Sequence, residues 1–149
     1  MPFRRCYQGS VNRWECDEND HLNVRFYLQK AHQALVVAAH EFGLLPITDA
    51  DTLLASLQTH HIRFLREARI AVPLTGECAV LAWQAPHLRL FTRLCHSLTG
   101  EVMASFISDF NLPNDAALPG FAPDLLALPE YGAPRGIVAE GSPYSGLTQ

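Results

Sequence analysis

The most regular pattern of apolar and polar positions in this chain runs from Val24 to Phe42 and predicts a long amphipathic helix. Its apolar residues recur at helical spacing: Val24, Tyr27, Leu28, Ala31, Ala34, Leu35, Ala38 and Phe42. Asn23 is a favourable N-cap residue and Gly43 a favourable C-cap residue. At about 1.5 Å per residue the helix is roughly 28 Å long, which spans the width of a small domain.

Beyond the helix, the pattern up to about residue 112 is that of β-strands. The predicted strands have a period of two or are short apolar runs, and they cover residues 3–16, 53–70, 78–85, 88–95 and 102–112. The segment 53–70 is long enough for a strand that bends or carries a bulge. Thr99 and Gly100 form the turn of a hairpin between the last two. Because a single helix can bury only one face of a sheet, we expect an α+β fold. In it an antiparallel sheet of five to six strands wraps around one long central helix.

The chain divides near residue 112 into a folded domain, residues 1–112, and an extension, residues 113–149. The extension holds six of the ten prolines and five of the nine glycines. Such a composition predicts coil that packs on the body or is partly disordered. Residues 123–128 are the one place in it where a helical turn is expected.

Composition narrows the classes of function. A chain of 149 residues with 48% hydrophobic residues fits one domain with its own core. A net charge of -4 argues against nucleic acid as a partner, since such binders carry clustered Lys and Arg. No stretch approaches the roughly 20 apolar residues of a membrane span, and no signal-like apolar run follows the first residues. We therefore expect a cytoplasmic protein that does not associate with membranes.

No metal site is expected. The four cysteines form no C-x-x-C pair, which favours reduced thiols over a disulfide framework or a zinc site. They are Cys6, Cys16, Cys78 and Cys95. His60 and His61 are neighbours on a predicted strand, so their side chains point to opposite faces and cannot easily share one metal ion.

The residues best suited to chemistry lie just before the long helix. Asp17, Asn19, His21 and Asn23 alternate with other residues, so they stay close together in an extended or a bent loop. The helix start beside them offers unpaired backbone N–H groups and a partial positive charge, which suit a carbonyl oxygen that becomes negative during reaction. The loop is therefore a candidate active site. The plainer interpretation is that Asp17 caps a turn and Asn23 caps the helix.

The pattern Asp17-x-Asn19-x-His21-x-Asn23, followed by Tyr27, resembles the hotdog-fold acyl-CoA thioesterases of the 4-hydroxybenzoyl-CoA thioesterase type. Two later segments extend the likeness over about residues 9–112. Residues 61–68 resemble the second strand of that family, and residues 98–104 resemble its last hairpin.

The resemblance implies a hotdog fold and a homodimer or homotetramer with active sites at the subunit interface. It also implies a coenzyme A thioester as substrate, no cofactor other than the coenzyme A of that substrate, and Asp17 as the catalytic carboxylate. Asp17 would either attack the thioester carbonyl directly or deprotonate a water molecule that does so. His21 or Asn23 would fix the carboxylate or the water.

Further substrate contacts are assigned as hypotheses. The backbone amides of Asn23 and Val24 would hold the oxyanion, with Asn19 nearby in the same loop. His61, Arg63 and Glu67 lie on the later segment. Arg63, Glu67 and Arg69 would share a strand face, where they either bind the phosphates of coenzyme A or form a merely solvated stripe.

One residue departs from the family pattern. The family usually has glycine before the histidine, and this chain has Asp20. Glycine suggests a backbone position with positive φ, which Asp tolerates better than most residues, so the loop is expected to keep its shape.

Two other functions stay open. The loop also resembles the signature of hotdog enoyl-CoA hydratases, although the spacing here is one residue shorter and the usual proline is missing. A noncatalytic acyl-CoA-binding protein is the other alternative, and the retention of Asp17 speaks against it.

Overall fold

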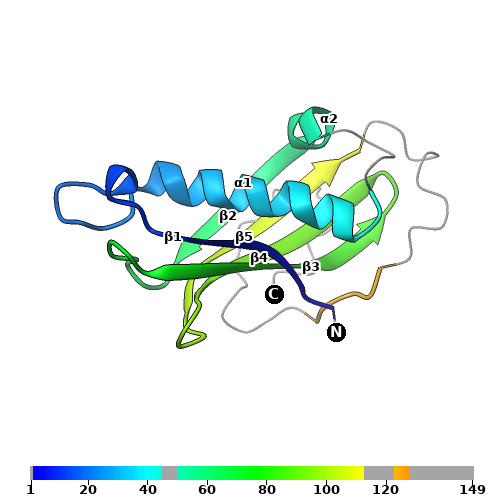
Figure 1. Cartoon of the computed structure of the whole chain (residues 1–149). Coiled ribbons are helices and arrows are strands. Elements are labelled where there is room, and N and C mark those ends of the chain that lie inside the picture. The colour runs from blue at the N-terminus through cyan, green and yellow to red at the C-terminus, as the bar shows by residue number, and fades with distance from the viewer. Residues whose placement is uncertain (1, 45–49, 113–122, 128–149) are drawn as a thin grey trace.

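The computed structural model describes residues 2–44, 50–112 and 123–127 of the chain. In these residues one long helix lies across one face of an antiparallel sheet (Figure 1). The strands are β1 (Arg4–Ser10), β2 (Leu57–Phe64), β3 (Pro73–Gln84), β4 (His87–His96) and β5 (Val102–Asn111). The helices are α1 (Val24–Glu41), α2 (Ala50–Ala55) and a 3₁₀ turn (Arg13–Glu15).

The sheet has five strands in the order β1-β3-β4-β5-β2, and every neighbouring pair is antiparallel. Consecutive strands β3, β4 and β5 form a meander, while β1 and β2 occupy the two edges. The predicted α+β architecture, with an antiparallel sheet and one long central helix, is confirmed.

Local sequence determines where α1 begins and ends. The Asn23 side chain accepts a hydrogen bond from the Arg25 N–H at 3.0 Å, as its N-cap position predicts. At the other end Phe42 is the C-cap, and Gly43 follows with a φ of 83°, in the left-handed region that glycine favours.

The face that α1 turns to the sheet consists largely of small residues. Ala34 and Ala38 are fully buried against Cys6 of β1 and Cys78 of β3. Short side chains at these positions let the helix backbone approach β1 and β3 closely.

The prediction of a single strand over residues 53–70 was wrong at both ends. Residues 50–55 form α2, because a short apolar run fits a helix as well as a strand and Leu53 is fully buried in the core from there. The strand then stops at Phe64, where the N–H groups of Leu65 and Arg66 both donate to the Met103 carbonyl, at 2.9 and 3.1 Å. Residues 65–70 leave the ladder.

Two other strand boundaries also differ from prediction. β3 starts at Pro73, five residues before the predicted residue 78, and its pairing with β1 requires Gly76. A Cβ at Gly76 would lie 2.8 Å from the Tyr7 Cβ, so a side chain there would push the edge strand away. β1 ends at Ser10 rather than near residue 16, because the Glu15 side chain accepts from the Asn12 N–H at 2.9 Å and closes the 3₁₀ turn.

The described part of the C-terminal extension, residues 123–127, lies beside β3. The Leu126 N–H donates to the Val80 carbonyl at 2.8 Å, and the Leu126 side chain packs on Leu81, Phe91 and Ile107. These residues form no helix, so the helical turn expected there is not found within 123–127. The rest of the extension lies outside the described residues.

Among the described helices, none combines the length and the apolar character needed to cross a membrane. All four cysteines are free. No group of three or more His, Cys, Asp or Glu side chains is placed to hold a metal ion within the described ranges.

His60 lies between the sheet and α1. Its ring is stacked on Phe106 with 5.5 Å between centroids, contacts His32 of α1 at 5.6 Å, and its Nδ1 lies 2.7 Å from the Ser108 Oγ. Burial, followed by the neighbouring His32 and His61, lowers the pKa of His60 to about 4. The imidazole is therefore neutral at physiological pH.

This depressed pKa predicts a pH dependence of stability. The unfolded chain, in which a histidine pKa is about 6.5, binds a proton that the folded chain resists. The stabilisation due to neutral His60 is therefore complete above about pH 6.5 and is lost as the pH falls to about 4. Urea denaturation at about pH 6.5 and at about pH 4 measures how far the free energy of unfolding falls between the two. This fall should be roughly 1–3 kcal/mol smaller in His60→Gln than in wild type. The exposed His40→Gln variant is the control, and an equal loss in wild type and His60→Gln would contradict the prediction.

Candidate active site

The loop between the 3₁₀ turn and α1 is closed by Asp17. Its Oδ1 accepts hydrogen bonds from the backbone N–H of Asn19 at 2.9 Å and of His21 at 3.1 Å. The Asp17 N–H donates in turn to the His21 carbonyl at 2.9 Å. Asp20, at the tip, has a φ of 60°, which confirms the positive φ predicted for this position. Asp20 therefore keeps the loop shape that glycine usually provides.

Hydrogen bonds tie this loop to residues 65–70, the segment that leaves the sheet after β2. The Leu22 N–H donates to the Ala68 carbonyl at 2.7 Å, and the Ile70 N–H donates to the Asp20 carbonyl at 3.1 Å. His21 and Arg69 form an antiparallel bridge between these two bonds. The two segments, far apart in sequence, therefore form one wall.

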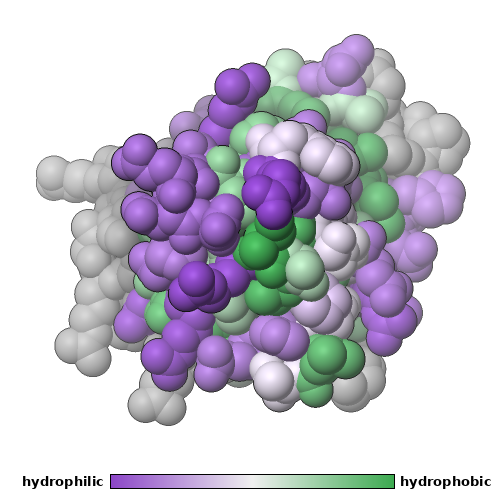
Figure 2. Space-filling model, turned by 60° about the vertical axis from the view of Figure 1, so that its left-hand side comes forward, coloured by the Kyte–Doolittle hydropathy of each residue, from purple (hydrophilic) through white to green (hydrophobic). Residues whose placement is uncertain are grey.

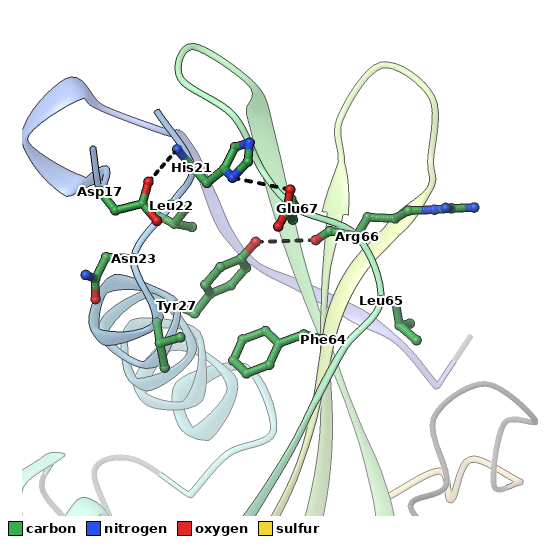
Figure 3. Close-up of a pocket in the computed structure, with 10 residues that line it drawn as sticks. Asp17, His21, Leu22, Asn23, Tyr27, Phe64, Leu65, Arg66 and Glu67 are labelled. Atoms are coloured by element: carbon green, nitrogen blue, oxygen red, sulfur yellow. Dashed lines mark hydrogen bonds and ion pairs between the residues drawn. The ribbon is translucent and has the colours of Figure 1, made fainter. Parts of the chain in front are cut away.

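A pocket of about 410 Å³ lies between this wall and the start of α1. Its lining residues are Asp17, His21, Leu22, Asn23, Val24, Tyr27, Phe64, Leu65, Arg66 and Glu67. At this end of the molecule apolar side chains lie in a hollow bordered by hydrophilic ones (Figure 2). The pocket thus combines an apolar interior with ionisable groups on one side, as Figure 3 shows.

The Asp17 carboxylate keeps one oxygen available. Oδ1 is engaged in the loop, whereas Oδ2 has no hydrogen-bond partner among the described residues, and the residue is exposed. Asp17 can therefore shape the turn with Oδ1 and still offer Oδ2 for chemistry.

His21 is paired with Glu67 across the pocket. The His21 Nδ1 lies 3.2 Å from the Glu67 Oε2, with side-chain exposures of 24% and 75%. Glu67 was expected on a strand face with Arg63, but β2 ends before it, so Glu67 turns towards the loop instead. A carboxylate at this distance from one ring nitrogen holds the orientation of the imidazole.

Tyr27, on the apolar face of α1, is 4% exposed in the hydrophobic core and also forms the back of the pocket. Its hydroxyl accepts from the Ala68 N–H at 3.1 Å and donates to the Arg66 carbonyl at 3.4 Å. Burial raises the pKa of Tyr27, so the phenol stays protonated and keeps its bond to the Arg66 carbonyl. Its ring meets Phe64 edge-on, with 5.1 Å between centroids. The available signal was its spacing of four residues from Asn23, which places both on one helix face.

The start of α1 offers one free amide rather than the expected two. The Asn23 N–H donates to the Glu15 carbonyl at 2.9 Å, so it is not available to an oxyanion. The Val24 N–H has no acceptor among the described residues, and Val24 is half exposed at the pocket. The Asn23 side chain is likewise occupied as the helix cap.

Three predicted substrate-binding residues do not line this pocket. Asn19 is exposed. His61 pairs with Ile107 and Arg63 with Ser105, on the sheet face opposite to that of His60, because strand residues alternate between faces. Roles for these residues in substrate binding stay predictions without support from the pocket.

Comparison with known proteins identifies the relatives of this architecture. Residues 11–112 match the family model described as the thioesterase-like superfamily. No curated protein matches the chain significantly.

Solved structures share the fold. A putative thioesterase from Pseudomonas putida KT2440 has a TM-score of 0.65 and 22% identity, covering 83% of this chain and 79% of that chain. A thioesterase from Thermus thermophilus complexed with coenzyme A and Zn has a TM-score of 0.62 and 17% identity, covering 87% and 88%. A 1,4-dihydroxy-2-naphthoyl-CoA thioesterase from Synechocystis has a TM-score of 0.58 and 15% identity, covering 78% and 86%. The shared architecture is the hotdog fold that the sequence predicts.

The cap at Asn23 yields a prediction for stability. Asn23→Ala should lower the free energy of unfolding by about 1 kcal/mol, since the Arg25 N–H loses its acceptor. Asn23→Asp keeps an acceptor and should stay within a few tenths of a kcal/mol of wild type. Urea denaturation at neutral pH measures both, with the exposed Asn19→Ala as control. Equal losses in the Ala and Asp variants would show that the side chain does not act as a cap.

Proposed function

Because this chain belongs to the thioesterase-like superfamily, we propose that it is an acyl-CoA thioesterase that hydrolyses a coenzyme A thioester to the free acid and CoA. The observation that carries this proposal is the position of Asp17, whose carboxylate borders a partly apolar pocket beside the start of α1. The Thermus thermophilus thioesterase in complex with coenzyme A supports the choice of substrate class. We include in this proposal that the chain is of the 4-hydroxybenzoyl-CoA thioesterase type, which its sequence resembles.

The pocket residues divide between the two parts of the substrate. Leu22, Val24, Tyr27, Phe64 and Leu65 offer apolar contacts to the acyl group. Arg66, whose side chain is 64% exposed and pairs with Glu101 at 3.4 Å, would exchange this partner for an anionic group of coenzyme A. The thioester carbonyl would then lie between Asp17 and the Val24 N–H.

The chemistry follows from the thioester. A thiol with a pKa of about 8.5 leaves readily as a thiolate, so the protein must supply a nucleophile and stabilise an oxyanion. The Val24 N–H, at the positive end of α1, donates to the oxyanion. Neither role requires a metal ion or a cofactor besides the coenzyme A of the substrate.

Asp17 takes one of two routes. In the first, its Oδ2 attacks the carbonyl carbon, the C–S bond breaks, and water hydrolyses the resulting mixed anhydride to the acid. In the second, the carboxylate takes a proton from water as the water oxygen attacks the same carbon; the C–S bond then breaks, and the proton passes to the departing CoA thiolate. His21, oriented by Glu67, holds the water or the carboxylate in place.

The assignment of Asp17 predicts the outcome of a hydrolysis assay. With a panel of acyl-CoA thioesters, Asp17→Asn should lower kcat by about 10²- to 10⁴-fold, as loss of a general base or nucleophile does. Thiol release measures the rate, and the exposed acid of the same loop, Glu18→Gln, is the matched control. Unchanged turnover in Asp17→Asn would remove Asp17 from the mechanism.

The same panel separates the alternative functions. Hydration of enoyl-CoA substrates without thiol release would assign the chain to the hydratases. Tight acyl-CoA binding without any turnover would make it a noncatalytic binding protein.

A homodimer is part of the proposal. β2 is an edge of the sheet, and the edge of a sheet readily pairs with a strand of another chain. Beside it a groove of about 610 Å³ runs along α1, lined by Arg25, Phe26, Leu28, Gln29, His32, Gln33, Val36 and Leu54. His32 in the groove contacts His60 of β2, so the groove and the strand edge adjoin. A tetramer would need a second interface.

Sedimentation velocity tests this interface. The wild-type chain should sediment at twice the monomer mass of 16.5 kDa or more. Val36→Glu, which puts a charge into the groove, should shift the protein towards the monomer, since burying an unpaired charge is costly. Val37→Glu, on the next and more exposed residue, should leave the mass unchanged. A monomeric wild type at all concentrations would overturn the dimer.

A cytoplasmic location is the last element of the proposal. The four free thiols support it, because reducing compartments keep cysteines in this state.

A further inference from the structure

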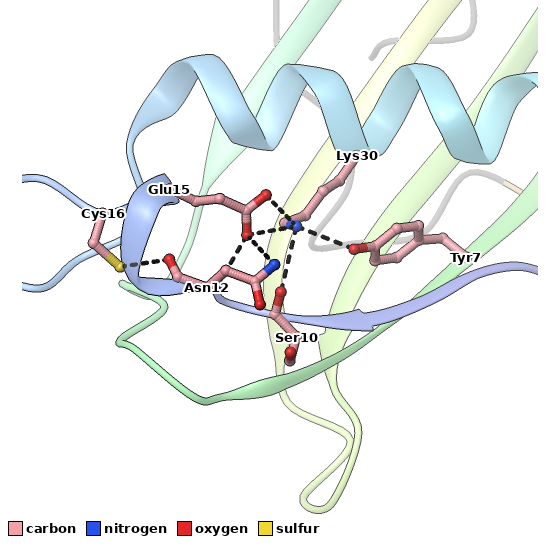
Figure 4. A network of polar contacts seen from close by, with 6 residues as sticks. All are labelled: Tyr7, Ser10, Asn12, Glu15, Cys16 and Lys30. Carbon is pink, nitrogen blue, oxygen red and sulfur yellow. Dashed lines mark hydrogen bonds and ion pairs between the residues drawn. The ribbon is translucent and has the colours of Figure 1, made fainter.

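Behind the candidate active site lies a buried network centred on Lys30 (Figure 4). Lys30 is 4% exposed, and its Nζ lies 3.0 Å from both Glu15 carboxylate oxygens. It also donates to the Tyr7 hydroxyl at 3.1 Å and to the Ser10 carbonyl at 3.4 Å. Burial alone would lower the pKa of Lys30, but the hydrogen bonds with Tyr7 and Glu15 outweigh it and raise the pKa. The ammonium is therefore charged in the folded protein.

Glu15 is equally well satisfied. Its Oε1 accepts from the Asn12 backbone N–H at 2.9 Å and from the Asn12 Nδ2 at 3.1 Å, besides the bonds from Lys30. A buried ion pair is seldom more stabilising than apolar residues of similar size. What such a pair adds is geometry, because charges and hydrogen bonds fix one arrangement where apolar contacts permit several.

The geometry that Glu15 fixes is that of the active site. Its side chain is held by Lys30 within α1, while its backbone carbonyl accepts the Asn23 N–H at the start of the same helix. Asp17 follows two residues later, in the loop that its own side chain closes. Both ends of the segment 15–23 are thus attached to α1. Glu15, which Lys30 holds, is hydrogen-bonded through its carbonyl to the Asn23 N–H, and Asn23 directly precedes Val24.

We propose that Glu15 and Lys30 are positioning residues, which set the placement of Asp17 relative to the Val24 N–H without touching the substrate. This role rests on the proposed thioesterase function. Because the apolar contacts to the acyl group come from other residues, loss of the pair lowers kcat and leaves KM nearly unchanged.

The test replaces the pair by apolar residues. Single removal of Lys30 leaves a buried charge and should lower Tm by on the order of 10 °C, so Glu15→Leu combined with Lys30→Met is the principal variant. At a temperature well below its Tm, kcat for acyl-CoA hydrolysis should fall by on the order of 10- to 100-fold, with KM within about twofold of wild type. Lys30→Arg, which keeps the ion pair, should recover most of the rate.

The matched control is the ion pair Glu77–Arg93 on β3 and β4, with 2.6 Å between its atoms and no residue in the pocket. Glu77→Leu combined with Arg93→Met should leave kcat unchanged. Should the principal variant not fold, Glu15→Asp keeps the charge but shortens the side chain, so the carbonyl bond to Asn23 or the ion pair must shift and kcat should fall. A folded principal variant with wild-type kcat, or wild-type kcat in Glu15→Asp, overturns the proposal.

A second readout does not depend on activity. Hydrogen exchange of the Asn23 amide should be about tenfold faster or more in the principal variant and unchanged in the control. If the wild type hydrolyses no thioester, the thioesterase function fails, and the exchange rate still decides whether the pair fixes the loop. Equal exchange rates in the principal variant and wild type would overturn the positioning role.

Discussion

The close packing of α1 on the sheet is the constraint on which the rest of the structure depends. Ala31, Ala34 and Ala38 are fully buried on the sheet-facing side of the helix. Because these side chains are short, the helix lies close to β1 and β3, and its position relative to the strands is narrowly defined. The position of the first turn of α1 relative to the strand ends is therefore fixed. Residues 15–22 have to bridge the distance from the end of β1 to that turn.

The candidate site is built around polar atoms that have no hydrogen-bond partner among the described residues. One oxygen of Asp17 closes its loop, the Asn23 N–H meets the Glu15 carbonyl, and the Asn23 side chain caps the helix. The Asp17 Oδ2 and the Val24 N–H remain without partners among the described residues, and both groups belong to residues that line the pocket. The proposed thioester cleavage would use these two groups as the negative oxygen and the N–H donor, beside the residues whose other atoms shape the loop.

Local signals in the sequence predicted much of this arrangement. The helical spacing of apolar residues predicted α1, and Asn23 predicted where it begins. Asp20, in a position where the family usually has glycine, indicated a positive φ. The position of Glu67 could not be predicted, because it depends on where β2 ends, and that is decided by hydrogen bonds to Met103 and between Leu22 and Ala68. Such contacts join residues far apart in the chain, so they produce no regular pattern of apolar and polar residues in the sequence.

The most direct test of the account is a crystal structure of the Asp17→Asn variant with an intact acyl-CoA bound. We expect the acyl group in the pocket, against Tyr27 and Phe64, with the thioester oxygen about 3 Å from the Val24 nitrogen. The carbonyl carbon should face residue 17. A thioester bound elsewhere, such as on the opposite face of the sheet near Arg63, would contradict the account.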